Sequence, residues 1–272
     1  MNFKLLFVLI LLISAPGCLK KSSGLPAPTK NITAMTLEEA QHAASYYQET
    51  AYDDLTIKAL ERVITLSTDH EISAQALLKL ADTYVKAGMY EKAQNSYKEF
   101  ITLYPGNAQV AYAAYQEIIA HYKEVRPAYR DQQKTRDVIA LAEQYEENYP
   151  HTTYIQHIHE MRDTAYKLLL EHEVMVVQFY LTKYQLEHSN KSAISCIKRL
   201  EYIKKDIIPH IANKKDYSRT ITLINRLLDT YNPQKLNNIE ELVSLIDTIT
   251  QNFYDILYAD SLFNMRLLTN VL

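Results

Sequence analysis

The stretch AQALLKLADTYVKAGMYEKAQNSYKEFITLYP, residues 74–105, decides the fold of this 272-residue chain. It contains two runs of apolar residues with the spacing of one helix face. The first run consists of Leu77, Leu80, Ala81 and Tyr84, and the second of Ala93, Tyr97, Phe100 and Tyr104. Gly88 separates the runs, where a residue without a Cβ can end a helix, and Pro105 closes the second. The stretch is therefore predicted to be a hairpin of two helices.

The order and spacing of these residues match the tetratricopeptide pattern, whose period is about 34 residues. Small side chains at Ala81 and Ala93 stand where the paired helices cross closely. Because one such hairpin cannot bury its own apolar face, it requires neighbouring hairpins. The chain has only four Gly, which disfavours a β-rich fold. We therefore predict an all-α fold, a tetratricopeptide-like right-handed solenoid of about five helix pairs.

Further helical segments flank the central hairpin. Thr36 and Glu39 predict a capping box at the start of a weaker first repeat. Pro105 and Pro150 delimit a third pair that is about 11 residues longer than one period, and the surplus falls in the turn around 124–132. Such insertions lie on one face of a repeat array, and this is often a binding face.

The segment after Pro150 is helical and long, since residues 151–208 contain neither Pro nor Gly. We expect a turn at 188–190, a helix that stops near Pro209, and further helices around 218–231 and 238–258. The apolar stripe of the long helix is predicted to include Phe179. On this basis residues 34–210 are assigned to repeats and 211–272 to divergent C-terminal helices.

The amino terminus has the features of a cleaved signal peptide, assigned to residues 1–17. Lys4 precedes an apolar run at 5–13, which is far shorter than the roughly 20 residues of a membrane span. Small residues then lead to Cys18, an arrangement that resembles a bacterial lipobox. Cys18 is therefore predicted to be lipidated, with 18–33 as a flexible tether. The alternative is an ordinary signal peptide with an incidental Cys. Leu19 replaces the Asp of an inner-membrane retention signal, so an outer membrane is expected.

Composition argues against several classes of function. A net charge of −3 provides no basic footprint for nucleic acid. Cys196 is the only other cysteine and is expected to be a small buried residue. The chain has 22 Tyr, a residue that can supply stiff contact area to partners, but most are expected to pack between helices, including Tyr84, Tyr97 and Tyr145.

No catalytic, metal or cofactor site is predicted. The chain lacks His-Glu-x-x-His, a Gly-rich phosphate loop and Gly-x-Ser-x-Gly. His157 and His159 are two residues apart, so they point away from each other on a helix. The cluster of Glu143, Glu146 and Glu147 is interpreted as a solvated helix face.

Several motifs together resemble the lipoprotein family of the β-barrel assembly machinery, the BamD/ComL family. The lipobox, the tether and the interrupted third repeat occur in the same order. Arg-Asp-Gln-Gln-Lys-Thr-Arg at 130–136, Tyr-Pro-His-Thr-Thr-Tyr at 149–154 and Gln-Phe-Tyr at 178–180 are similar to family motifs. The resemblance covers roughly residues 36–209.

The resemblance implies a lipid-anchored protein on the periplasmic side of the outer membrane. It would bind the periplasmic domains of the barrel-inserting protein through its C-terminal half and unfolded outer-membrane proteins near its N-terminal half. Lys-Arg-Leu-Glu at 198–201 resembles the Arg-x-Glu helix that contacts the barrel-inserting partner, which implies that Arg199 pairs with a partner carboxylate. The alternative is a solvated basic face of Lys198, Arg199, Lys204 and Lys205.

Two other functions stay open at this point. One is a repeat lipoprotein scaffold of another envelope system, such as pilus secretin assembly or cell-division coordination. The other is an envelope hydrolase that carries repeats, which the missing zinc motif disfavours. The insertion before Arg130 and the long helix after Pro150 favour barrel assembly over the other envelope systems.

Overall fold

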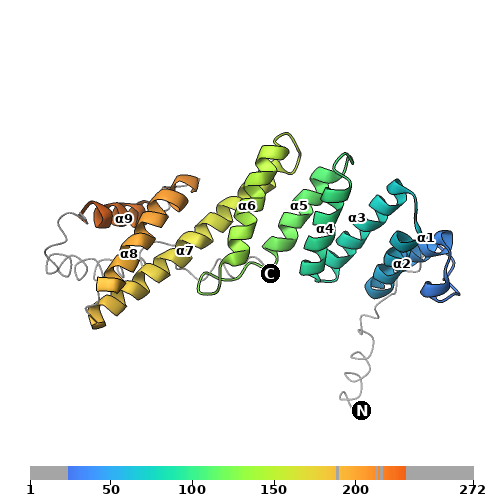
Figure 1. Cartoon of the computed structure of the whole chain (residues 1–272), viewed down its shortest axis with the longest axis horizontal. Coiled ribbons are helices and arrows are strands. Elements are labelled where there is room, and N and C mark those ends of the chain that lie inside the picture. The colour runs from blue at the N-terminus through green and yellow to red at the C-terminus, as the bar shows by residue number, and fades with distance from the viewer. Residues whose placement is uncertain (1–23, 188–189, 212–213, 215–216, 231–272) are drawn as a thin grey trace, which may run out of the picture. The chain divides into compact units, whose positions relative to one another are not determined.

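A computed structural model describes residues 24–187, 190–211, 214 and 217–230, and these contain helices and no strand. The α-helices, labelled in Figure 1, are α1 (Leu37–Glu49), α2 (Asp53–Leu66), α3 (His70–Lys86), α4 (Tyr90–Leu103), α5 (Val110–Tyr122), α6 (Gln133–Asn148), α7 (Ile155–Glu187), α8 (Asn190–Tyr202) and α9 (Ser218–Thr230). Three short elements complete the order: η1 (Ile32–Ala34), η2 (Ile203–Ile207) and η3 (Ile208–His210). The predicted all-α class is confirmed.

Consecutive helices pack on one another. Helix α2 contacts both α1 and α3, α6 contacts both α5 and α7, and α8 packs on α7. The contacts divide the chain into two units, the first ending at Ser96 and the second beginning at Tyr97, within α4. Pairing of neighbours along the chain is the organisation expected of tetratricopeptide-like repeats.

Small residues allow the helices of the first unit to approach closely. Those that are buried on α1, α2 and α3 are Ala40, Ala43, Ala44, Ala59, Ala74, Ala76 and Ala81. The predicted capping box is present, since the Glu39 backbone N–H donates to Thr36 and the Thr36 backbone N–H donates to the Glu39 carboxylate. Helix α3 begins four residues before Ala74, because the Asp69 carboxylate accepts two backbone N–H groups there.

The turn between α3 and α4 contains Gly88 with φ +72°, a left-handed conformation that a residue without a Cβ adopts freely. The predicted turn of the central hairpin is confirmed. Tyr84 and Tyr97, from its two helices, are buried as predicted, and so is Tyr145 on α6.

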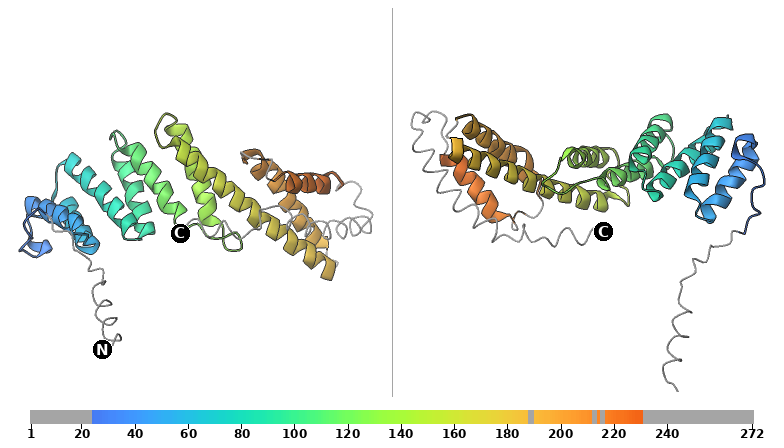
Figure 2. Two further views of the ribbon diagram at one scale, coloured as in Figure 1. Left: turned by 180° about the vertical axis from the view of Figure 1, so that it is seen from behind. Right: turned by 90° about the horizontal axis from the view of Figure 1, so that it is seen from below.

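The second unit is organised around α7, a helix of 33 residues that runs without interruption, as the sequence predicts. Figure 2 shows α6 and α8 alongside it. Its buried residues include Ile158, Leu170, Val177 and Leu181. Phe179 is 60% exposed, so its predicted place in the apolar stripe is wrong. Each residue turns about 100° along a helix, and Phe179 therefore lies across the helix from Val177 and Leu181.

The chain after α8 follows the expected order as far as the structure describes it. Helix α8 passes into η2 and η3, and the run ends at His210, directly after Pro209, whose ring lacks a backbone donor. Helix α9 lies where a helix was predicted around 218–231. The predicted helix at 238–258, the turn residues 188–189, the signal peptide and Cys18 lie outside the described residues.

Candidate functional site

Arg199 lies near the end of α8, at the edge of the face that this helix buries. Cys196, Leu200 and Ile203 are buried, and Arg199 follows Cys196 by three residues on the same side of the helix. The Arg199 side chain remains 42% exposed. The unit therefore covers only part of this side chain.

Arg199 forms an ion pair with Glu173 of α7, which the sequence did not suggest. One Arg199 terminal nitrogen, Nη1, donates to Glu173 Oε2 at 3.0 Å. Arg136 of α6 approaches from the other side, and its Nη2 donates to Glu173 Oε1 at 3.2 Å. We call these three residues the Arg136–Glu173–Arg199 cluster. It joins three helices through one carboxylate.

The Glu173 side chain is completely buried, whereas the two arginines are 37% and 42% exposed. A buried carboxylate is costly unless it is paired and hydrogen-bonded, and both of its oxygens are paired here. Two guanidinium groups around one carboxylate leave one positive charge in excess. Arg199 therefore combines a contact to a buried carboxylate with a side chain that is partly exposed, and its neighbour Lys198 is exposed as expected.

The spacing of apolar residues along α7 indicates that Glu173 is buried. Buried residues at Leu169, Leu170 and Val177 lie three or four positions away, so Glu173 occupies a core position of the helix. A carboxylate at such a position requires a cationic partner. Spacing alone does not identify that partner, because Arg136 is 37 residues and Arg199 26 residues away along the chain.

The carboxylates of α6 also differ from expectation. Glu143 accepts a hydrogen bond from the Tyr166 hydroxyl at 2.6 Å, and Glu146 pairs with Arg162. The interpretation as a solvated face is wrong for Glu143 and Glu146, which face α7, and correct for exposed Glu147. Burial, together with the bond to Glu143 and its charge, raises the pKa of the Tyr166 hydroxyl.

The Tyr-Pro-His-Thr-Thr-Tyr motif forms the turn between α6 and α7. The Tyr145 hydroxyl and Thr152 hydroxyl are 2.9 Å apart, which ties the end of α6 to the turn. Tyr154 stacks on Tyr115 of α5 with ring centroids 4.4 Å apart. The Tyr115 hydroxyl lies 2.6 Å from His157 Nδ1. These contacts give the motif a structural role in holding α5, α6 and α7 together.

The family of the chain follows from comparison with known proteins. A family model named YfiO and described as outer membrane lipoprotein matches residues 35–207. This segment covers well over half of the chain and contains the Arg136–Glu173–Arg199 cluster. The chain belongs to the YfiO family of outer membrane lipoproteins.

Two curated relatives of this YfiO-family chain carry the name outer membrane protein assembly factor BamD. The protein of Rickettsia prowazekii is 26% identical over 162 residues, which are 60% of this chain and 59% of the relative. That of Caulobacter vibrioides is 25% identical over 161 residues, 59% of this chain and 48% of the relative. The similarity thus spans about half the length of the relatives. The predicted resemblance to the BamD/ComL family is confirmed.

The described part of this YfiO-family chain contains neither a candidate metal site nor an exposed thiol. No three His, Cys, Asp or Glu residues among residues 24–187, 190–211, 214 and 217–230 are grouped to hold a metal ion. His159 pairs with Glu146, whereas His157 contacts Tyr115. Cys196 is buried as predicted, and burial raises the pKa of its thiol to about 12. None of the described helices has the length and apolar content that a membrane span needs.

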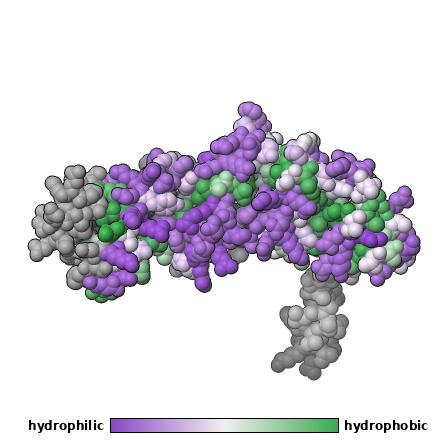
Figure 3. All heavy atoms as spheres, viewed as in Figure 1, coloured by the Kyte–Doolittle hydropathy of each residue, from purple (hydrophilic) through white to green (hydrophobic). Residues whose placement is uncertain are grey.

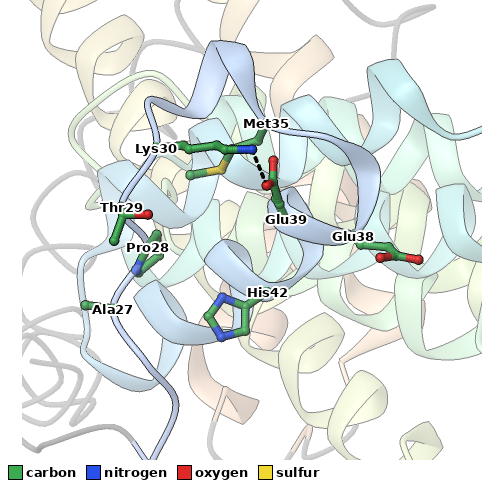
Figure 4. Close-up of a pocket in the computed structure, with 8 residues that line it drawn as sticks. All are labelled: Ala27, Pro28, Thr29, Lys30, Met35, Glu38, Glu39 and His42. Carbon is green, nitrogen blue, oxygen red and sulfur yellow. Dashed lines mark hydrogen bonds and ion pairs between the residues drawn. The ribbon is translucent and has the colours of Figure 1, made fainter.

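A shallow hollow in the first unit lies beside η1 and the start of α1 (Figure 4). The Lys30 ammonium forms an ion pair with Glu39 across it, and hydrogen bonding to Lys30 lowers the pKa of the Glu39 carboxyl. Residues 27–29, Met35, Glu38 and His42 also line the hollow, as Figure 4 shows. Because Lys30 and Glu39 neutralise each other, the hollow presents no unpaired charge from these two groups.

Proposed function

We propose that this YfiO-family protein is a lipid-anchored scaffold of the β-barrel assembly machinery on the periplasmic face of the outer membrane. It binds the periplasmic domains of the barrel-inserting protein through its second unit and nascent outer-membrane proteins through its first. Its role is binding, without catalysis or a cofactor. The names of the two relatives and the family match over residues 35–207 support this proposal.

The Arg136–Glu173–Arg199 cluster is the observation that links the proposal to a particular residue, Arg199. A guanidinium has five N–H donors in a planar fork, and Arg199 uses one of its terminal nitrogens on Glu173. The exposed part of the side chain can meet a second carboxylate. A partner carboxylate would neutralise the excess positive charge of the cluster. Glu173 holds Arg199 in place before the partner arrives, which lowers the entropy that binding costs.

The surroundings of the cluster favour polar recognition. The exposed residues nearest to Arg199 along α8 and η2 are the polar Lys198, Glu201 and Lys204. Hydrophilic side chains also predominate over α6 and α7 on the face shown in Figure 3. Charged contacts across such a surface contribute mainly to specificity and association rate. An ion pair at Arg199 is therefore expected to select the partner and set the register of docking.

The anchoring proposal depends on Cys18. Each acyl CH₂ buried in a membrane contributes about 0.8 kcal/mol, and a single chain binds only marginally. Two or three acyl chains on Cys18 would hold the protein stably. Cys18→Ser should release the protein into the soluble periplasmic fraction after cell fractionation. Retention of the variant in the membrane fraction would argue against acylation.

Affinity purification from a detergent-solubilised envelope tests the scaffold role. A large β-barrel protein with periplasmic domains should co-purify with the wild-type chain. Arg199→Ala should reduce its recovery at least fivefold, whereas the matched variant Lys198→Ala, on the same helix and exposed, should leave it unchanged. Recovery of a secretin or of a cell-division protein instead would overturn the proposal in favour of another envelope system.

A further inference from the structure

The loop that joins α5 to α6, residues 123–132, is fixed from within by the side chain of Gln132 (Figure 1). Gln132 is buried, and its Nε2 donates to the carbonyl oxygens of Pro127 at 2.9 Å and Arg130 at 3.0 Å. Its Oε1 in turn accepts a hydrogen bond from the Thr135 hydroxyl at 2.7 Å. The loop therefore wraps around one amide whose donor and acceptor are both used.

Helix α7 supplies a second attachment. His172 Nδ1 lies 2.6 Å from the carbonyl oxygen of Ala128, and since a carbonyl only accepts, Nδ1 carries the hydrogen. Ala128 is buried, and Val125 packs against the core of the second unit. The repeats could pack without an ordered loop at this position. The loop is nevertheless attached at Val125, at Ala128 and at Gln132.

The part of the loop that stays outside has a distinct composition. The Tyr129 side chain is 63% exposed, and the Arg130 guanidinium carbon lies 5.5 Å from the centre of its ring. Arg126 is exposed as well, whereas the acidic Glu124 is paired with Lys134. Asp131 accepts the backbone N–H of Gln133 at the start of α6. The loop thus exposes one aromatic ring with Arg130 against it, and a second exposed arginine, Arg126, in the same loop.

From this geometry we infer that Tyr129, Arg126 and Arg130 form a docking site for an acidic segment of another protein. Tyr and Arg are the residues that most often dominate binding energy at protein interfaces. The loop is ordered in advance, so binding does not have to pay for ordering it. The Arg130 guanidinium beside the ring and the exposed Arg126 of the same loop favour carboxylates and repel basic segments. The site consists of other residues than the Arg136–Glu173–Arg199 cluster and does not depend on the function proposed above.

A membrane surface is the competing partner for a loop that exposes an aromatic ring and two arginines. A loop that inserts among lipids gains by burying several apolar side chains. Tyr129 is the only large hydrophobic side chain that loop 123–132 exposes. The fixed shape of the loop also suits a shaped protein surface better than a fluid one, so the observations favour a protein segment.

Fluorescence anisotropy with a labelled Glu-Glu-Phe-Glu-Glu peptide tests the site on the full chain carrying Cys18→Ser, which removes the anchor as a route to lipid. Tyr129→Ala and the double variant Arg126→Gln/Arg130→Gln should each weaken peptide binding at least fivefold. Phe179→Ala is the matched control, because Phe179 is an aromatic residue of similar exposure on α7, and it should bind as the wild type does. Equal affinity in all variants would overturn the inference.

A second pair of measurements separates the remaining outcomes. Gln132→Ala keeps the three contact side chains but releases the loop, and it should also weaken peptide binding; unchanged affinity would show that the fixed loop is not part of the site. Phosphatidylglycerol vesicles should sediment the protein equally with and without Tyr129→Ala. Sedimentation that depends on Tyr129, without peptide binding that depends on it, would assign the loop to the membrane and overturn the inference.

Discussion

The two units differ in where they place their charges. In the first unit the ion pairs Lys30–Glu39 and Lys86–Asp53 lie at the surface, with lysine side chains 56% and 52% exposed. Pairs of this kind contribute little to stability. In the second unit Glu173 is fully buried between two arginines. The described part of the first unit is therefore held mainly by apolar packing, whereas the second has a carboxylate buried inside it.

This difference supports the partner-binding role that we propose for the second unit. A buried ion pair is often no more stabilising than apolar residues of the same volume, so packing alone does not require one. The cluster fixes the pose of Arg199 at the surface, which a partner can use. The contrast between the units leads to four predictions for the purified protein.

The largest effect is expected when Glu173 loses both partners. Arg136→Ala/Arg199→Ala leaves a buried carboxylate without a cation and should lower the free energy of unfolding by about 3–5 kcal/mol, measured by urea denaturation. Each single variant should cost less, because one arginine remains. Adding Glu173→Gln to the double variant should recover part of the loss. A double variant as stable as the wild type would show that the cluster is not a buried charge network.

The second prediction concerns pH and Glu171 of α7, where burial raises the pKa to about 7. A raised carboxyl pKa stabilises the folded state below the unfolded value of 4.5, and this contribution is lost as pH rises through 7. Glu171→Gln should abolish this loss, which is on the order of 2 kcal/mol. Urea midpoints at pH 5 and pH 8 measure it, with exposed Glu147→Gln as control. The same dependence in both variants would contradict the prediction.

The third prediction tests packing in the first unit. Ala81 is completely buried on α3, and Ala81→Leu adds atoms where no space is left. The free energy of unfolding should fall by about 1–3 kcal/mol, measured by denaturant titration. Ala140→Leu, on an exposed position of α6, should have almost no effect. If the two variants were equally stable, close helix approach at Ala81 would not hold the first unit together.

The smallest effect is expected from a polar contact in the first unit. The Tyr84 hydroxyl donates to Glu61 at 3.0 Å, and Tyr84→Phe should cost about 1 kcal/mol in thermal or urea denaturation. Tyr129→Phe removes a hydroxyl from an exposed ring and should cost nothing measurable. A loss in Tyr84→Phe as large as that in the double arginine variant would remove the contrast between the units.

The sequence determined the helical hairpins of this protein because their signals are local. Gly88, Pro150 and the box of Thr36 and Glu39 act within a few residues, and each lies where the structure ends, turns or begins a helix. The prediction of the apolar stripe on α7 was correct for Val177 and wrong for Phe179. A run of consecutive apolar residues does not show which of them face inward.

Only the tertiary structure decided what the charged residues do. Arg199 was identified by its resemblance to a family motif, but Glu173 and Arg136 come from other helices, far away along the chain. The same holds for Gln132 and His172, which fix the loop that presents Tyr129. Helix periodicity depends on residues that are close together along the chain. The partner of a buried charge depends on which helices pack together, and this packing is a property of the whole unit.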